Sequence, residues 1–90
     1  MSSYALSPDV HDIYVDGEQA AVYVGDAVLV LGPLASALVE WVQEGPRDID
    51  SLAGLAVARF GAPGNVDPAE LIAAQVADLC DAGILAICPI

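Results

Sequence analysis

The stretch AAVYVGDAVLVLG, residues 20–32, is apolar on both sides of a single Gly-Asp step. A glycine followed by a polar residue between two apolar, β-branched runs is typical of a tight hairpin connection. We therefore predict one strand over Gln19–Val24 and the next over Ala27–Leu31. The same region does not predict a membrane span, because Gly32-Pro33 interrupts its uncharged run and a span needs ~20 apolar residues.

Another strand is predicted before this hairpin. Val10–Val15 alternates apolar and polar residues and leads into Asp16-Gly17-Glu18, which is a turn signal. The three segments together predict an antiparallel meander. The only histidine, His11, lies in the first strand beside Asp12, a position more typical of a surface residue than of a catalyst.

Two helices are predicted directly after the sheet. The first begins at Pro33, where the missing N–H costs nothing, and ends at Gly45. The second is capped by Asp48 or Asp50 and ends at Gly61. Apolar residues recur at helical spacing in both segments, so each helix is expected to bury one face.

A third helix begins at Asp67-Pro68, with Glu70 in the capping-box position, and runs to about Ala82. The apolar tail Ile84–Ile87 is predicted to form an added strand or a wing. The expected class is α+β, a three-stranded antiparallel meander followed by three helices, similar to winged helix-turn-helix proteins. We expect one domain over residues 1–90, with a core of about 10–87. The residues assigned to the core are Leu31, Leu38, Trp41, Leu52, Leu55, Ile72, Val76 and Leu79.

The chain is strongly acidic, with 2 Lys or Arg residues against 13 Asp or Glu residues and a formal net charge of −11. Nucleic-acid binding is not expected, because it depends on cations that neutralise phosphates, and anionic lipid would be repelled as well. A hydrophobic fraction of 57% disfavours a disordered chain. The first residues contain no basic segment followed by an apolar one, so we expect no signal peptide and a cytoplasmic location.

No arrangement of residues predicts catalysis. The carboxylates are scattered over caps and turns, which is typical of solubility and helix capping. Cys80 and Cys88 have no close Cys or His companions, so reduced thiols are expected rather than a metal site. We therefore expect a binding module that is not an enzyme and has no catalytic residue, metal or cofactor.

Three segments resemble the PqqD family, the RiPP recognition elements that bind leader peptides of ribosomally made natural products. VLVLGPLASALVEWVQEG, residues 28–45, is similar to the strand, turn and first helix of that family. DIDSLAGLAVARFG, residues 48–61, resembles its second helix, which ends in Phe and a turn. LIAAQVADLCDAGIL, residues 71–85, resembles its third helix, with Leu79 and Gly83-Ile84-Leu85 at the places of the Leu…Gly-Leu-Leu ending.

The resemblance implies a stand-alone, non-catalytic protein that binds a precursor leader peptide and presents it to modifying enzymes. In that family the peptide adds a strand to the third strand, and the third helix forms the other wall of the groove. Lasso-peptide biosynthesis, with a leader peptidase and a cyclase as partners, is the favoured setting, and a radical SAM enzyme is the partner in a pyrroloquinoline-quinone-like pathway. The implied peptide-binding residues are Ala27, Val28, Leu29, Val30, Leu31, Leu71, Ala74, Gln75 and Asp78.

Other interpretations of the same residues stay open. Val28, Leu29, Val30 and Leu71 are also compatible with a purely structural role in the core. A winged-helix transcription regulator would have a similar order of elements, but residues 67–82 contain no Lys or Arg. A structural subunit could use the open strand for oligomerisation, although we favour a monomer.

Overall fold

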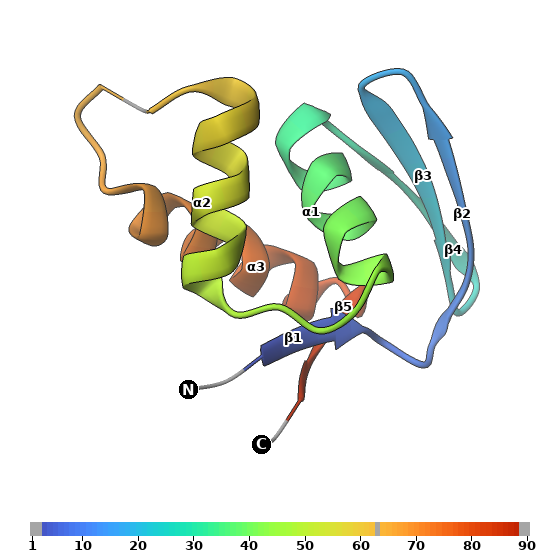
Figure 1. Cartoon of the computed structure of the whole chain (residues 1–90). Coiled ribbons are helices and arrows are strands. Elements are labelled where there is room, and N and C mark those ends of the chain that lie inside the picture. The colour runs from blue at the N-terminus through green and yellow to red at the C-terminus, as the bar shows by residue number, and fades with distance from the viewer. Residues whose placement is uncertain (1–2, 63, 89–90) are drawn as a thin grey trace.

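A computed structural model describes residues 3–62 and 64–88 of the chain (Figure 1). The predicted α+β fold, with a three-stranded antiparallel meander and three helices, is confirmed. A second sheet of two strands lies at the base of the helices. The elements in chain order are β1 (Ser3–Leu6), β2 (Val10–Asp16), β3 (Gln19–Val24), β4 (Ala27–Leu31), α1 (Pro33–Gln43), α2 (Ile49–Phe60), α3 (Pro68–Asp81) and β5 (Leu85–Cys88).

The meander has the strand order β2-β3-β4, and two glycine turns set its register. Gly17 and Gly25 have φ angles of 63° and 53°, and each is the first residue of a two-residue turn. The residue that follows each glycine does not have a positive φ, so both turns have the type II′ pattern, which matches the twist of the flanking strands. The pairs Asp16–Gln19 and Val24–Ala27 therefore flank the two turns.

The helix starts follow from local chemistry. Pro33 occupies the first turn of α1, and the carbonyl oxygen of Gly32 before it accepts the Ser36 N–H at 2.9 Å. Asp48, rather than Asp50, caps α2, because its Oδ1 accepts the Ser51 N–H at 2.8 Å. Asp67 caps α3, but its Oδ1 accepts the N–H of the residue two positions on, Ala69, at 2.9 Å.

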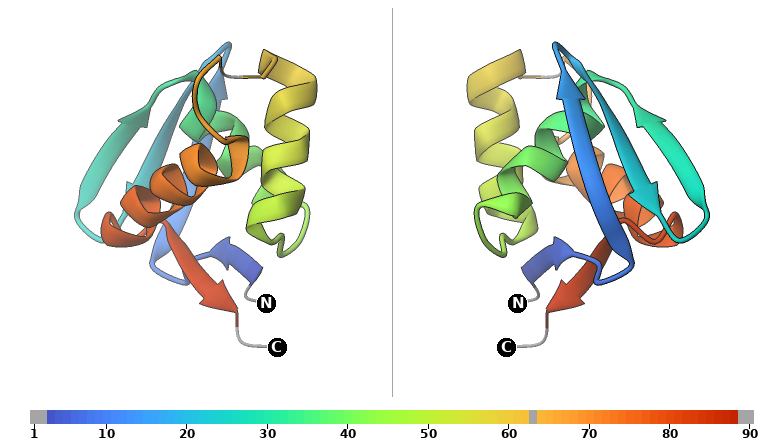
Figure 2. Two further views of the ribbon diagram at one scale, coloured as in Figure 1. Left: turned by 90° about the vertical axis from the view of Figure 1, so that its left-hand side faces the viewer. Right: turned by 90° about the vertical axis from the view of Figure 1, so that its right-hand side faces the viewer.

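The core lies between the inner face of the meander and the three helices, and α1 covers the sheet (Figures 1 and 2). Five of the predicted core residues are buried: Leu38, Leu52, Ile72, Val76 and Leu79. Leu31 and Trp41 are half-buried and pack against these residues. Leu55 is half-buried as well, but it is not part of the core cluster.

The second sheet adds an element that the sequence did not predict. β1 pairs antiparallel with β5, in a register that joins Ser3 to Cys88 and Leu6 to Leu85. Tyr4 extends the pairing, because its backbone exchanges hydrogen bonds of 2.8 and 3.0 Å with Arg47. Tyr4 and Leu6 pack against the core, so the core begins before residue 10.

The tail after α3 forms the strand β5, and a strand was one of the two structures predicted for it, the other being a wing. Gly83, with a φ of 83°, lets the chain leave α3, and Ile84 behind it is fully buried. Within the described ranges, no helix combines the length and hydropathy that crossing a membrane requires.

Candidate functional site

β4 is an edge strand of the meander, paired with β3 and with no other described strand. In a two-residue hairpin, the pair that flanks the turn exchanges both hydrogen bonds, and hydrogen-bonded pairs alternate along the strands. Ala27, Leu29 and Leu31 therefore direct their peptide groups toward β3. The N–H and C=O groups of Val28 and Val30 point the other way, toward the open side.

The opposite edge, β2, carries features that oppose strand addition. Its register shifts between Val10 and Asp12, which is a bulge at His11, and the His11 Nε2 lies 2.7 Å from the Gly25 carbonyl oxygen. Asp12 and Asp16 add two carboxylates to this strand. The sequence of β4, AVLVL, has no charge and no proline, and its register is regular. β4 is thus the less protected of the two edges.

The side chains of β4 alternate between the two faces of the sheet. Leu29 and Leu31 are half-buried and pack on the core. Val28 and Val30 lie on the outer face, with 52% and 69% of their surface exposed. The predicted binding residues on β4 therefore divide into two inward anchors and two outward side chains, and Ala27 is exposed beside the turn.

The outward valines belong to a larger apolar surface, the outer-face cluster of Tyr14, Tyr23, Val28 and Val30. Val28 lies opposite Tyr23 across the strand pair, and the Tyr14 and Tyr23 rings meet edge to face at 5.7 Å. Asp12 borders the cluster, and its hydrogen bond and negative charge raise the pKa of Tyr14. Antiparallel sheets commonly have a polar outer face, so this apolar outer face is a candidate binding surface.

The predicted residues of α3 do not share one environment. Leu71 and Gln75 are half-buried, whereas Ala74 and Asp78 are exposed. α3 packs on α2 and β5, and it approaches the meander with its C-terminal end (Figures 1 and 2). A Cβ atom placed on Gly83 would lie 3.4 Å from the Val24 Cγ1. The Asp78 end of the helix is therefore the part nearest the β3–β4 hairpin.

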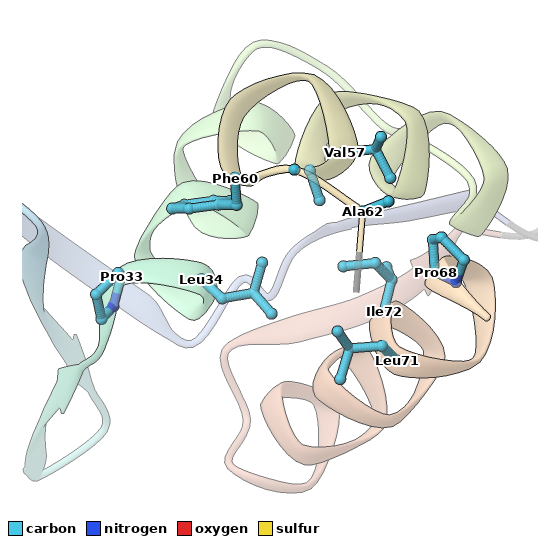
Figure 3. A pocket seen from close by; sticks show the side chains of 10 residues that line it. Pro33, Leu34, Val57, Phe60, Ala62, Pro68, Leu71 and Ile72 are labelled. Carbon is cyan, nitrogen blue, oxygen red and sulfur yellow. The ribbon is translucent and has the colours of Figure 1, made fainter. Parts of the chain in front are cut away.

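Leu71 instead lines a cavity of about 430 Å³ among the three helices, which we call the helical pocket (Figure 3). The start of α1, the end of α2 and the start of α3 form its wall. The pocket was not predicted from the sequence, because its residues come from three helices and only Leu71 among them was predicted to bind. The lining residues are Pro33, Leu34, Ala56, Val57, Phe60, Gly61, Ala62, Pro68, Leu71 and Ile72.

The polar side chains of the described residues include two free thiols and two ion pairs. No group of three or more His, Cys, Asp and Glu residues there is arranged to hold a metal ion. Cys80 and Cys88 are free thiols, and burial, followed by the charge of Asp81, raises the pKa of Cys80. Arg59 pairs with a carboxylate of α1 at 3.2 Å, and Arg47 lies 3.9 Å from Glu44. The two arginines thus form no basic surface.

Comparison with known proteins adds no assignment. No protein-family model matches the chain, and no curated protein matches it. The open edge of β4, the outer-face cluster and the charge of the chain are therefore the structural features that bear on function.

Proposed function

We propose that the protein binds an extended peptide by strand addition to β4, and that this peptide is the leader region of a ribosomally synthesised precursor. The contrast between the two edges of the meander carries the proposal. β2 is bulged and acidic, whereas β4 offers the peptide groups of Val28 and Val30 on a regular, uncharged strand. In strand addition, backbone hydrogen bonds give affinity and alternate side chains give selectivity.

The surroundings of β4 constrain the peptide. Its outward side chains would extend the outer-face cluster beyond Val28 and Val30, which favours apolar residues at alternate positions. Its inward side chains would lie on the side of α3, whose C-terminal end is the part of that helix nearest the β3–β4 hairpin. A net charge of −11 favours a peptide that carries Lys or Arg and disfavours an acidic one.

The resemblance to the PqqD family supports a non-catalytic role in the cytoplasm. The bound leader would be presented to modifying enzymes, namely a leader peptidase and a cyclase in a lasso-peptide pathway or a radical SAM enzyme in another. A winged-helix transcription regulator is the weaker alternative, because α3 contains no Lys or Arg that could neutralise phosphates.

Self-association is a second candidate, and the outer-face cluster favours it. Exposed aromatic and branched side chains on the outer face of a sheet can pack against a second sheet. The charge of each chain opposes such a dimer. Light scattering at rising protein concentration separates the two roles, since a protein that stays monomeric excludes self-association through this face.

Isothermal titration with the leader segment of a short precursor encoded beside this gene tests the proposal. We expect a dissociation constant of ~100 μM or tighter, which is modest for a specific interface. Amide NMR signals should shift at Val28 and Val30, with little change at Val15 on the opposite edge. A scrambled leader of the same composition is the matched control. Absence of binding at ~100 μM, or shifts only on β2, would contradict strand addition to β4.

A further inference from the structure

We propose that the helical pocket is a binding site for a small, uncharged aromatic molecule, separate from the peptide edge of β4. The cavity of about 430 Å³ falls in the range of ~300–1,000 Å³ that is usual for small-molecule sites. It is a feature of the helices, so its ligand does not have to take part in strand pairing.

The side chains of the wall favour an aromatic ring. Leu34, Leu71 and Ile72 point toward one another from α1 and α3 (Figure 3). Ile72 is fully buried at the base, whereas Phe60 at the end of α2 keeps 46% of its surface exposed. An exposed aromatic ring beside an apolar cavity can stack edge to face on a second ring, an arrangement that aromatic pairs prefer.

The chemistry of the wall favours a neutral ligand. None of the described lining residues has a charged or hydroxyl side chain, and the Arg59 guanidinium over the Phe60 ring is already paired with Glu40. An ion in the pocket would therefore lose its hydration without gaining a free partner. The net charge of −11 acts further against anions. Phenols, indoles and similar neutral rings fit both conditions, since their apolar area is buried while one polar group can stay at the mouth.

The pocket adjoins the proposed peptide site without being part of it. Pro33 and Leu34 follow β4 after a single residue, Gly32, and Leu71 is one of the residues predicted to bind peptide. If the proposed function is correct, ligand in the pocket would fix the α1 start beside the end of β4 and change the affinity for peptide. The ligand site itself is independent of that function.

NMR titration of the full chain with indole and with p-cresol tests the proposal. We expect saturable shifts of the Leu34, Phe60, Leu71 and Ile72 amides, with a dissociation constant of ~1 mM or tighter. Benzoate, a charged ring of similar size, should bind at least tenfold more weakly. No saturation at ~10 mM, or shifts centred on the outer-face cluster, would overturn the proposal.

A matched pair of substitutions locates the site. Val57→Trp fills the pocket from α2 and should weaken indole binding at least tenfold, whereas Val30→Trp places the same side chain on the outer face and should leave it unchanged. Equal effects of the two variants would overturn the assignment. The wild-type shifts test it again if Val57→Trp does not fold.

Adding the leader peptide to the indole complex separates a free ligand from a peptide side chain. Indole that stays bound at saturating peptide, with the same or a changed affinity, supports a separate ligand site. Competitive displacement by the peptide would overturn it and assign the pocket to a peptide side chain. Because indole binding is measured first without peptide, failure of the leader to bind leaves the indole titration intact as a test of the pocket.

Discussion

Replacing Val28 with proline tests the open edge directly. Proline removes the N–H of residue 28, which points away from β3, and such positions on edge strands tolerate proline. The Val28 side chain is 52% exposed on the outer face, so its loss removes little packing. We expect the free energy of unfolding to fall by less than about 1 kcal/mol, because no ladder hydrogen bond is lost.

The same substitution in the central strand gives the contrast. Ala21 lies opposite Tyr14, two pairs from the turn, so its N–H bonds to β2. Ala21→Pro would lose a hydrogen bond worth about 0.5–1.5 kcal/mol and leave the Tyr14 carbonyl unpaired, for a total of roughly 2–4 kcal/mol. Urea unfolding followed by circular dichroism measures both variants. A comparable loss in Val28→Pro would mean that its N–H is bonded and that β4 is not an open edge.

The binding measurement completes this prediction. One lost backbone hydrogen bond should raise the dissociation constant of the leader peptide roughly 2- to 10-fold in Val28→Pro. Val15→Pro removes an outward N–H from the opposite edge and should leave peptide affinity unchanged. If both variants bind like the wild type, the peptide does not add to either edge.

Three further changes test the fold and its titrating groups. Ile84→Ala should lower the free energy of unfolding by about 2–5 kcal/mol in the same urea assay, because this fully buried side chain leaves a cavity behind α3; a loss below about 1 kcal/mol would show that the site is not packed. The hydrogen bond from the Ser51 N–H lowers the pKa of Asp48 in the folded protein. The cap therefore stabilises the folded protein fully at pH values above the pKa that Asp48 has in the unfolded chain, and this stabilisation is lost as the pH falls through the lower pKa of the folded protein. Asp48→Ala should therefore unfold at lower urea than the wild type at pH 7, with the difference shrinking in acid; a gap that does not depend on pH would contradict this. Burial raises the pKa of Cys80, so iodoacetamide should modify this thiol more slowly at pH 8 than it modifies the amino acid cysteine in solution. A faster reaction would show that the thiol is not shielded.

Features set by neighbouring residues were predictable from the sequence. The hairpin at Gly25-Asp26 has its register fixed by the turn, so both strand boundaries agree with the structure. The start of α3 was predictable for the same reason, since Asp67 and Pro68 specify a cap and a first turn. The choice between Asp48 and Asp50 as the cap of α2 required the structure, because aspartate is a good cap at either position.

Features that depend on distant residues were not predictable. β1 is four residues long and pairs with β5 at the far end of the chain, so no local pattern identifies it. The helical pocket joins Leu34, Phe60 and Leu71 from three helices, and their packing angles decide whether a cavity remains. The binding residues on β4 came from a family resemblance, whereas the contrast between the edges required the bulge in β2.

Val28 and Val30 combine two properties that the proposed roles use differently. Their peptide groups lie on the open edge, and their side chains lie on the outer face. Strand addition depends on the peptide groups, whereas self-association through the outer-face cluster depends on the apolar side chains. Val28→Thr keeps the N–H but makes the side chain polar, and Val28→Pro does the reverse. A protein that binds leader peptide at β4 should tolerate threonine and lose affinity with proline, whereas a dimer through the sheet face should show the opposite order.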